Sequence, residues 1–424
     1  MGHLTKLLRR GAEVQAPWGM ADQTISSVTN FLILWLAARH SGIERFGLFG
    51  VAFTVYIVSL WITRSLVGEP FTIRHTGSDA NELRRAGRQA VGAAIFIACL
   101  IAVPMAGPAT LVEGWSVALV VMGLAMPALL AQDTYRYVLI ASGKVRAAAL
   151  NDAFWLAAQL PAVAWILWND APIEWLLAAF GLGAAAAAVL GALQAGVRPN
   201  PAAGPEWLRS TANLGLPFLV ELLGVYGAGQ LALLGLAAVG EVGAVGRLRA
   251  ALLLLSPVTV LCAGLFLVGA PEAMRIRHRN PLELSRFLLF LCSSALAVTA
   301  WAGVIWLVPD RFGRLLLGGN WLRGTEVLAA VALMTVATIF VMAGMLGLRA
   351  IDAVRATLPR RLLAAPAFAL ATLAGVKAAG PQGAAAGLAA ASVLSAVLTW
   401  FEFRRALRNL ARADLHAREE LAAT

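Results

Sequence analysis

Apolar runs of about twenty residues recur along the whole 424-residue chain, and each is long enough to cross roughly 30 Å of hydrocarbon as a helix. Only 13% of the residues are charged and 60% are hydrophobic, whereas soluble domains carry about a quarter charged residues. No long polar stretch separates the runs, so we expect no soluble domain between them. The sequence therefore predicts an all-α polytopic membrane protein and argues against a soluble enzyme.

We expect about twelve transmembrane helices joined by short loops. Tryptophans support the predicted ends, because indole rings prefer the headgroup level and most of the tryptophans lie near these ends. The predicted spans are 19–38, 46–68, 89–107, 114–131, 148–168, 174–196, 212–238, 246–270, 287–308, 325–348, 362–378 and 383–403.

Basic residues indicate the orientation, because cytoplasmic loops carry an excess of Lys and Arg. With a cytoplasmic N-terminus, 25 basic residues fall on the inner side and 8 on the outer side, and Arg64 is left inside a span. The net charge of +11 is thus explained by topology rather than by nucleic-acid binding. Arginine greatly outnumbers lysine, as in GC-rich bacterial genomes, so we expect a bacterial plasma-membrane protein with both termini cytoplasmic.

An internal repeat relates the two halves of the chain. A shift of 196 residues places Gly19, Gly47 and Gly50 on Gly215, Gly243 and Gly246, and further short matches follow in the same order. Two six-helix halves in parallel repeat are typical of transporters. We therefore predict an N-terminal lobe 1–198, a Pro-rich linker 199–211, a C-terminal lobe 212–403 and a cytoplasmic tail 404–424.

Arg64 is the strongest local signal, because it lies inside the second predicted span. An arginine at a helix centre costs about 2.5–3.5 kcal/mol, so its side chain should face protein, water or an anionic ligand. Alternatively, the long side chain extends to the nearby inner interface. Both interpretations stay open.

Glu221 lies about 13 Å into the seventh span, too deep for its carboxylate to reach the interface. It is therefore protonated, paired or in an aqueous cavity. Pro217, Gly224 and Gly227 lie near it and predict a bend that could serve as a gating hinge. The alternative is that these glycines allow close helix packing.

The first span is unusually polar, with Asp22 and Asn30 as candidate cleft residues. Asp22 lies at a depth similar to that of Arg64 on the next, antiparallel helix, so an Asp22–Arg64 ion pair is one interpretation. The other is that Asp22 stabilises the dipole at its helix N-terminus. Four polar residues flank an inner loop and are interpreted as solvated caps rather than ligands: Gln132, Asp133, Asn151 and Asp152.

No catalytic or cofactor-binding pattern is present in the sequence. The five histidines lack metal-ligand spacing, and no phosphate-binding Gly-Lys-Ser/Thr loop occurs. Cys99, Cys262 and Cys292 all fall in apolar runs and are interpreted as small buried side chains. We therefore predict no enzyme activity, no metal and no cofactor, with an integral glycan-processing enzyme as a minor alternative.

Three segments resemble the polysaccharide-export and lipid-linked oligosaccharide flippases of the MATE-like exporter superfamily. They are Gly42 to Gly50, the second-half counterpart Gly243 to Ala251 running on to Ser256-Pro257, and the inner loop from Gln132 to Lys144. The resemblance implies two six-helix lobes around a central cleft that opens alternately to each side. Within it, Arg247 and Arg249 would lie at the outer mouth of the cleft.

We therefore expect a flippase for a lipid-linked glycan. Arg64, helped by Arg247 and Arg249, would bind the diphosphate of a polyprenyl-diphosphate oligosaccharide through bidentate hydrogen bonds. Glu221 would couple transport to protons, and Na⁺ is the alternative coupling ion. Membrane lipids are the other expected partner. A multidrug or cation antiporter of the MATE type stays open, as does a major-facilitator transporter, whose loop pattern Asp79 and Arg84 to Arg88 match in part.

Overall fold

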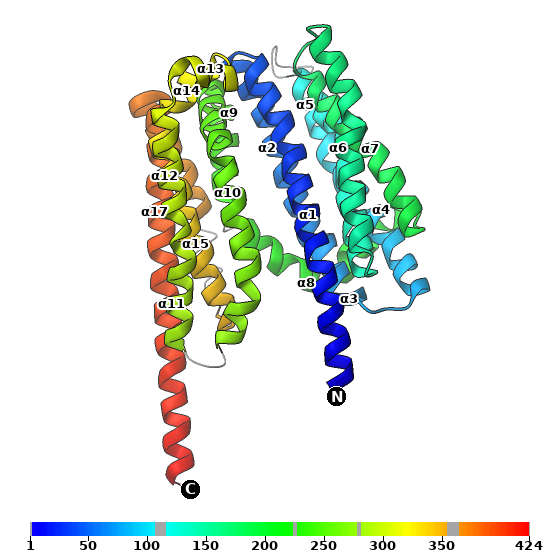
Figure 1. Ribbon diagram of the computed structural model, residues 1–424, viewed down its shortest axis with the longest axis vertical. Coiled ribbons are helices and arrows are strands. Elements are labelled where there is room, and N and C mark those ends of the chain that lie inside the picture. Colours follow the sequence, from blue (N-terminus) through cyan, green and yellow to red (C-terminus); the bar gives the residue numbers. More distant parts are fainter. Residues whose placement is uncertain (1, 107–115, 224–226, 278–280, 354–363, 424) are drawn as a thin grey trace. The chain divides into compact units, whose positions relative to one another are not determined.

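The computed structural model describes residues 2–106, 116–223, 227–277, 281–353 and 364–423 (Figure 1). The described residues form helices and loops without a β-strand, which confirms the predicted all-α membrane fold. Two compact units are formed, unit 1 from Met1 to Leu222 and unit 2 from Leu223 to Thr424.

Unit 1 is a bundle in which consecutive long helices run antiparallel. Helix α5 packs on α4 and α7, α6 packs on α7 and α1, and α8 packs on η1 and α4. Its elements are α1 (Gly2–His40), α2 (Ile43–Thr63), the π-helical turn η1 (Arg64–Gly68), α3 (Glu69–His75), α4 (Ala80–Ala106), α5 (Ser116–Ala141), α6 (Val145–Trp168), α7 (Trp175–Ala195), the short 3₁₀ turn η3 (Pro201–Ala203) and α8 (Gly204–Leu222).

Glycine and aspartate occupy short turns between these helices. Gly196 adopts a left-handed conformation (φ +66°) at the end of α7, which a residue with a Cβ adopts only at a cost. Asp79 caps α4, where its Oδ1 accepts hydrogen bonds from the N–H groups of Asn81 (2.8 Å) and Glu82 (3.0 Å). These local features allow long helices to follow one another with few intervening residues.

Unit 2 contains α9 (Ala228–Ala238), α10 (Val242–Arg277), α11 (Pro281–Cys292), α12 (Ser294–Leu307), α13 (Asp310–Leu317), α14 (Asn320–Thr325), α15 (Leu328–Ala350) and α17 (Ala364–Ala423). Helices α10, α12 and α17 all pack on α15. Figure 1 shows the short helices α13 and α14 at the end of the unit where α12 ends and α15 begins.

Helix α17 is two helices joined at a kink, because Ala379 and Gly380 have non-helical backbone angles. The two arms touch through backbone atoms. A Cβ added to Gly375 would lie 2.1 Å from the carbonyl oxygen of Gly383, and one added to Gly383 would lie 2.0 Å from that of Gly375. Small residues thus let two membrane helices approach without intervening side chains.

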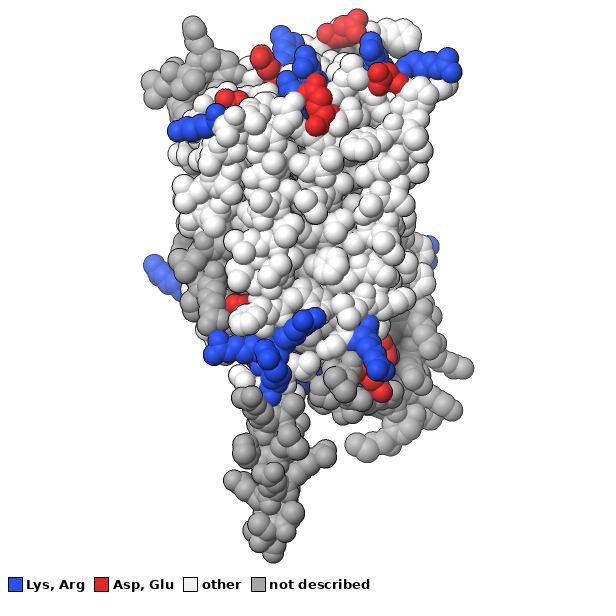
Figure 2. Space-filling model, turned by 90° about the vertical axis from the view of Figure 1, so that its left-hand side faces the viewer, with Lys and Arg blue, Asp and Glu red and all other residues white. Residues whose placement is uncertain are grey.

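Nine helical stretches in the described part of the chain are long and apolar enough to cross a membrane, so the protein is a multi-pass membrane protein. Of the twelve predicted spans, 19–38 lies within α1 and the described residues of 212–238 fall on α8 and α9, none of which is among the nine stretches. The described residues of 362–378 lie with 383–403 in the one stretch of α17. On the face drawn in Figure 2, charged side chains gather toward the two ends and leave a broad uncharged belt between them.

The end of the fourth predicted span differs from the structure. The predicted fourth span ended at 131, but α5 continues to Ala141 because the polar side chains beyond 131 are bonded inside unit 1. The predicted linker 199–211 contains η3 and the start of α8, and α8 belongs to unit 1, so the boundary between the compact units follows Leu222.

Candidate functional site

A cluster of five charged side chains lies within the helix bundle of unit 1. Arg64 comes from η1, Asp133 and Arg136 from α5, Asp22 from α1 and Asp152 from α6. We call these five residues the buried charge cluster. Charges within a membrane-spanning bundle are costly unless they are paired.

Arg64 and Asp133 form a two-point ion pair. Nη2 of Arg64 donates to Oδ1 of Asp133 at 2.6 Å, and Nε donates to Oδ2 at 3.0 Å. This fork-to-fork geometry fixes the plane of the guanidinium group. The Arg64 side chain is nevertheless 27% exposed, against 7% for Asp133, and its Nη1 donates no hydrogen bond to any residue that the structure describes. One edge of the guanidinium is thus held and the other is available.

Arg136 is the centre of the cluster. Its Nε donates to Oδ2 of Asp22 at 2.6 Å, and Nη1 lies 3.6 Å from Oδ1 of Asp133. Oδ2 of Asp152 lies 3.9 Å from Nε. One guanidinium therefore faces three carboxylates from three different helices.

A chain of amide side chains continues from the cluster. Nε2 of Gln132 donates to Oδ1 of Asp152 at 2.7 Å and to Oδ1 of Asn151 at 3.2 Å. Nδ2 of Asn151 donates to Oε1 of Gln194 at 3.1 Å and to the carbonyl of Ala187 at 2.8 Å. The network joins α5, α6 and α7 through buried polar contacts, which fixes the relative register of these helices.

The cluster holds three carboxylates against two guanidinium groups, a formal excess of one negative charge when all are ionised. Oδ1 of Asp22 and Oδ2 of Asp152 are buried and accept no hydrogen bond in the described structure. Such oxygens are costly unless they are neutralised. The arrangement can therefore take up one proton. No three acidic, histidine or cysteine side chains among the described residues could together hold a metal ion.

Solved transport proteins share this architecture over nearly their whole length. A multidrug resistance MATE family transporter of the MOP superfamily, in an inward-facing conformation, matches with a TM-score of 0.70 at 14% identity over 94% of this chain and 96% of that chain. The lipid II flippase MurJ, in an inward closed conformation, matches with a TM-score of 0.70 at 11% identity over 92% and 89%. The chain has the fold of the MATE-like exporters.

A eukaryotic MATE transporter has the same MATE-like fold, with a TM-score of 0.62 at 12% identity over 96% of this chain and 99% of that chain. A scan against protein families and a search of the curated proteins each return no match to the sequence. The resemblance expected from the short motifs is thus confirmed for the MATE-like fold.

The ion pairs and hydrogen bonds of the cluster correct two interpretations. The Asp22–Arg64 ion pair, which was one of two interpretations of Asp22, is wrong, because Asp22 pairs with Arg136 and Arg64 with Asp133. The interpretation of the four polar residues near the inner loop as solvated caps is also wrong. All four are buried and hydrogen bonded or ion paired within unit 1: Gln132, Asp133, Asn151 and Asp152.

Sequence reasoning missed Arg136 as a site residue by assigning it to the inner loop. A signal was present, because Asp133 and Arg136 are separated by three positions and therefore share a helix face. A helix extended through these residues would have brought two opposite charges onto the bundle-facing side of α5. Asn30, also predicted for the site, has a buried Oδ1 without a hydrogen-bond partner among the described residues.

In unit 2, the predicted arginines lie near the start of α10. Arg247 forms an ion pair with Glu326, and Nη2 of Arg249 donates to Oε1 of Gln230 at 3.0 Å. Arg249 is buried, with 9% exposure. Arg247 is thus neutralised by a carboxylate in this structure.

Two of the three predicted hinge residues lie in the described part of the chain. Pro217 is within α8, and Gly227 immediately precedes α9. Gly224 and the side chain of Glu221 lie outside the described residues. The hinge and the role of Glu221 therefore stay predictions.

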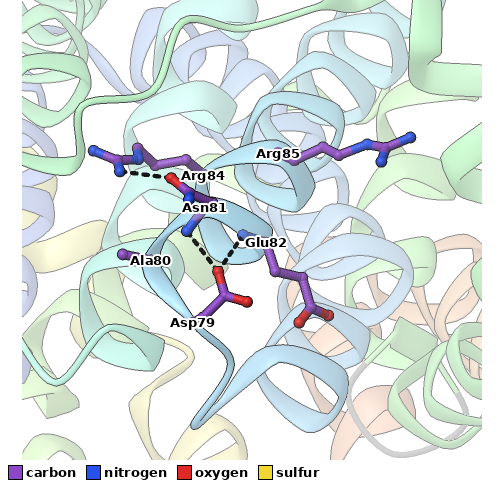
Figure 3. A pocket seen from close by; sticks show the side chains of 6 residues that line it. All are labelled: Asp79, Ala80, Asn81, Glu82, Arg84 and Arg85. Atoms are coloured by element: carbon purple, nitrogen blue, oxygen red, sulfur yellow. Dashed lines mark hydrogen bonds between the residues drawn. The ribbon is translucent and has the colours of Figure 1, made fainter.

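A surface hollow of about 580 Å³ at the start of α4 is formed by the loop that matched the major-facilitator pattern in part. Figure 3 shows Asp79 turned toward the backbone of Asn81 and Glu82, while Arg84 donates to the side chain of Asn81 at 3.0 Å. The pKa of Asp79 is lowered by the hydrogen bonds from Glu82 and Asn81. Its side chain therefore serves as a helix cap.

Proposed function

We propose that this protein is a flippase-type translocator that moves a lipid-linked glycan across a bacterial plasma membrane by alternating access. The substrate class is a polyprenyl-diphosphate-linked oligosaccharide. Its anionic diphosphate and polar glycan would pass through the protein while the lipid tail stays in the bilayer. The MATE-like fold supports a transport role, and the similarity includes the lipid II flippase MurJ.

The observation that carries the proposal is the available edge of Arg64. Asp133 holds Nε and Nη2, so the guanidinium is oriented before a ligand arrives, while Nη1 stays available on a side chain that is 27% exposed. A phosphate oxygen is the natural acceptor for such a donor, because charge-assisted bonds from arginine to phosphate are short and strong. Arg64 would thus bind the diphosphate without losing its structural partner.

A proton is the coupling ion that fits the buried charge cluster best. The third carboxylate leaves an excess negative charge, and the unbonded oxygens of Asp22 and Asp152 are the positions where a proton would relieve it. Protonation would weaken the attraction of these carboxylates for Arg136. The cluster could then exist in two arrangements, as alternating access requires.

Export of an organic cation is the second candidate, because the same acidic excess favours a positively charged ligand. The two candidates differ at Arg64. A cation exporter has no need of an arginine with an available edge, whereas binding of a diphosphate depends on it.

The deciding experiment is deletion of the gene in its host, followed by analysis of lipid-linked glycans and surface polysaccharide. Loss of surface polysaccharide with precursor accumulating on the inner leaflet is the expected result. Wild type and Arg85→Ala, which alters an exposed arginine on α4, should restore export, and Arg64→Ala should not. Unchanged glycans with altered sensitivity to cationic drugs would favour the second candidate.

A further inference from the structure

Arg64 begins a π-helical turn inside one continuous membrane-spanning stretch, Ile43–His75. The N–H of Glu69 donates to the carbonyl of Arg64, five residues earlier, rather than four as in an α-helix. Proline at position 70 favours this irregularity. In a regular helix the carbonyl of Leu66 would accept from residue 70, but proline has no N–H to donate.

The two sides of the turn are each fixed to a different partner in unit 1. On the N-terminal side, Arg64 is bound to Asp133. On the C-terminal side, Nη2 of Arg74 donates to the carbonyl of Ser210 at 2.8 Å and to Oδ1 of Asn213 at 3.1 Å. A residue step in an α-helix corresponds to about 100°, so changing this turn to a regular helix would rotate one side against the other by about that angle. Both sets of bonds require the wide turn.

Helix α8 is packed directly against this turn. The hydroxyl of Thr211 shares its proton between the carbonyl of Trp207 at 2.9 Å and that of Leu66 at 3.3 Å, the carbonyl that proline leaves without its usual donor. A Cβ added to Gly215 would lie 3.0 Å from Cα of Leu66 and 3.1 Å from the carbonyl oxygen of Ser65. The absence of a side chain at Gly215 thus allows α8 to contact the backbone of the turn.

We propose that Thr211 and Gly215 are positioning residues that hold the π turn and thereby keep Arg64 on Asp133, with Nη1 available to the substrate. Helix α8 is the last helix of unit 1, and the chain passes from it directly into unit 2. Tension or rotation in α8 would therefore reach Arg64 through the contacts of Thr211 and Gly215 with the turn. When α8 leaves the turn, the turn loses these two supports and Arg64 is no longer held on Asp133.

The transport part of this inference rests on the proposed function, whereas the geometric part does not. The test therefore uses two readouts on the full chain: amide hydrogen exchange of peptides covering 64–71 in purified protein, and surface polysaccharide in the deletion host. The variants are Thr211→Val, Thr211→Ser, Gly215→Ala and Pro70→Ala. Thr372→Val is the matched control, because Thr372 is a buried threonine of unit 2 bonded within its own helix.

Thr211→Val is expected to speed exchange in 64–71 by about two- to tenfold, as expected for the loss of one hydrogen bond, and to lower export. Gly215→Ala should do the same. Thr211→Ser should keep the wild-type exchange rate in 64–71 and the wild-type export. Thr372→Val should leave exchange in 64–71 unchanged. Pro70→Ala is the sharpest variant, because it restores the missing N–H. It should slow exchange in the turn and yet lower export, since a regular helix no longer aims Arg64 at Asp133.

Unchanged exchange in Thr211→Val would overturn the positioning role. Normal export by Pro70→Ala, with a turn that has become more protected, would overturn the link between the π turn and transport. If the wild type itself exports no glycan, the proposed substrate is wrong, while the exchange data still decide whether α8 holds the turn.

Discussion

A guanidinium group that is bound along one edge differs chemically from one that has no partner. Asp133 removes the rotational freedom of Arg64, so a ligand that binds the remaining edge loses little further entropy in ordering the side chain. The same pairing weakens the net positive charge seen by that ligand. Binding should thus depend on geometry as much as on charge.

Arg64→Lys is therefore expected to fail although it keeps the charge. A lysine ammonium cannot bind Asp133 at two points and present a further donor in the same plane. We expect export in the deletion host to fall by at least about tenfold, which corresponds to about 1.4 kcal/mol. Arg85→Lys, the same exchange on an exposed position of α4, should export normally. Full export by Arg64→Lys would show that charge alone suffices.

Arg136 should matter most for stability, because it faces three buried carboxylates. Arg136→Met leaves those carboxylates without their shared partner, and loss of one member of a buried ion pair costs about 3–5 kcal/mol. Asp152→Asn, by contrast, removes the excess charge and should be nearly neutral. Thermal unfolding of the purified variants in detergent tests this contrast. Equal midpoints for Arg136→Met and wild type would contradict it.

At the scale of elements, the two arms of α17 depend on glycine more than on hydrophobic contact. Gly383→Ala places a Cβ 2.0 Å from a backbone oxygen of the other arm, so the arms must separate. Overpacking of this kind typically costs about 1–3 kcal/mol. Thermal unfolding should show a lower midpoint. Gly264→Ala in α10 is the control, because no atom lies within 4 Å of the added Cβ, and alanine favours the helix.

The cap of α4 predicts a pH effect. The pKa of Asp79 is lowered in the folded protein, so its stabilising contribution is complete above the ordinary aspartate pKa of about 3.9 and is lost as the pH falls through the lowered value. Asp79→Ala should lower the unfolding midpoint at neutral pH, and Asp79→Asn should lower it less, because asparagine is also a good cap. The difference between wild type and Asp79→Ala should shrink in strong acid. A difference independent of pH would contradict the capping role.

Helices that depend on local composition could be predicted from the sequence, whereas ion pairs between distant helices could not. Long apolar runs predicted the helices, and Arg64 was conspicuous because a charge in such a run needs a partner. Its partner, Asp133, was not predicted, because the polar sequence from Gln132 to Arg136 is typical of the end of a helix. Only the long-range contacts with Asp22 and Asp152 explain why α5 continues through it. The one sign of the π turn in the sequence is Pro70.

At the scale of the whole molecule, the inside excess of basic residues predicts the orientation. In a chain whose three cysteines are replaced, single cysteines at Ser78 and Ser142 should be protected from an impermeant thiol reagent in intact cells. Cysteines at Asn169 and Glu241 should be labelled, because these loops lie on the predicted outer side. Labelling of Ser78→Cys from outside would show that the topology is the reverse of the predicted one. The direction of the proposed transport would then be reversed as well.

The wide turn at 64–68 also affects how residues are matched between this chain and others. A π turn contains one residue more than an α-helix of the same height, so a relative whose second span is regular will align only with a one-residue gap in this segment. An ungapped alignment would shift either Ile43–Thr63 or Glu69–His75 by one position, onto the wrong helix face. The equivalents of Arg64 and Arg74 must therefore be identified separately, each from its own side of the turn.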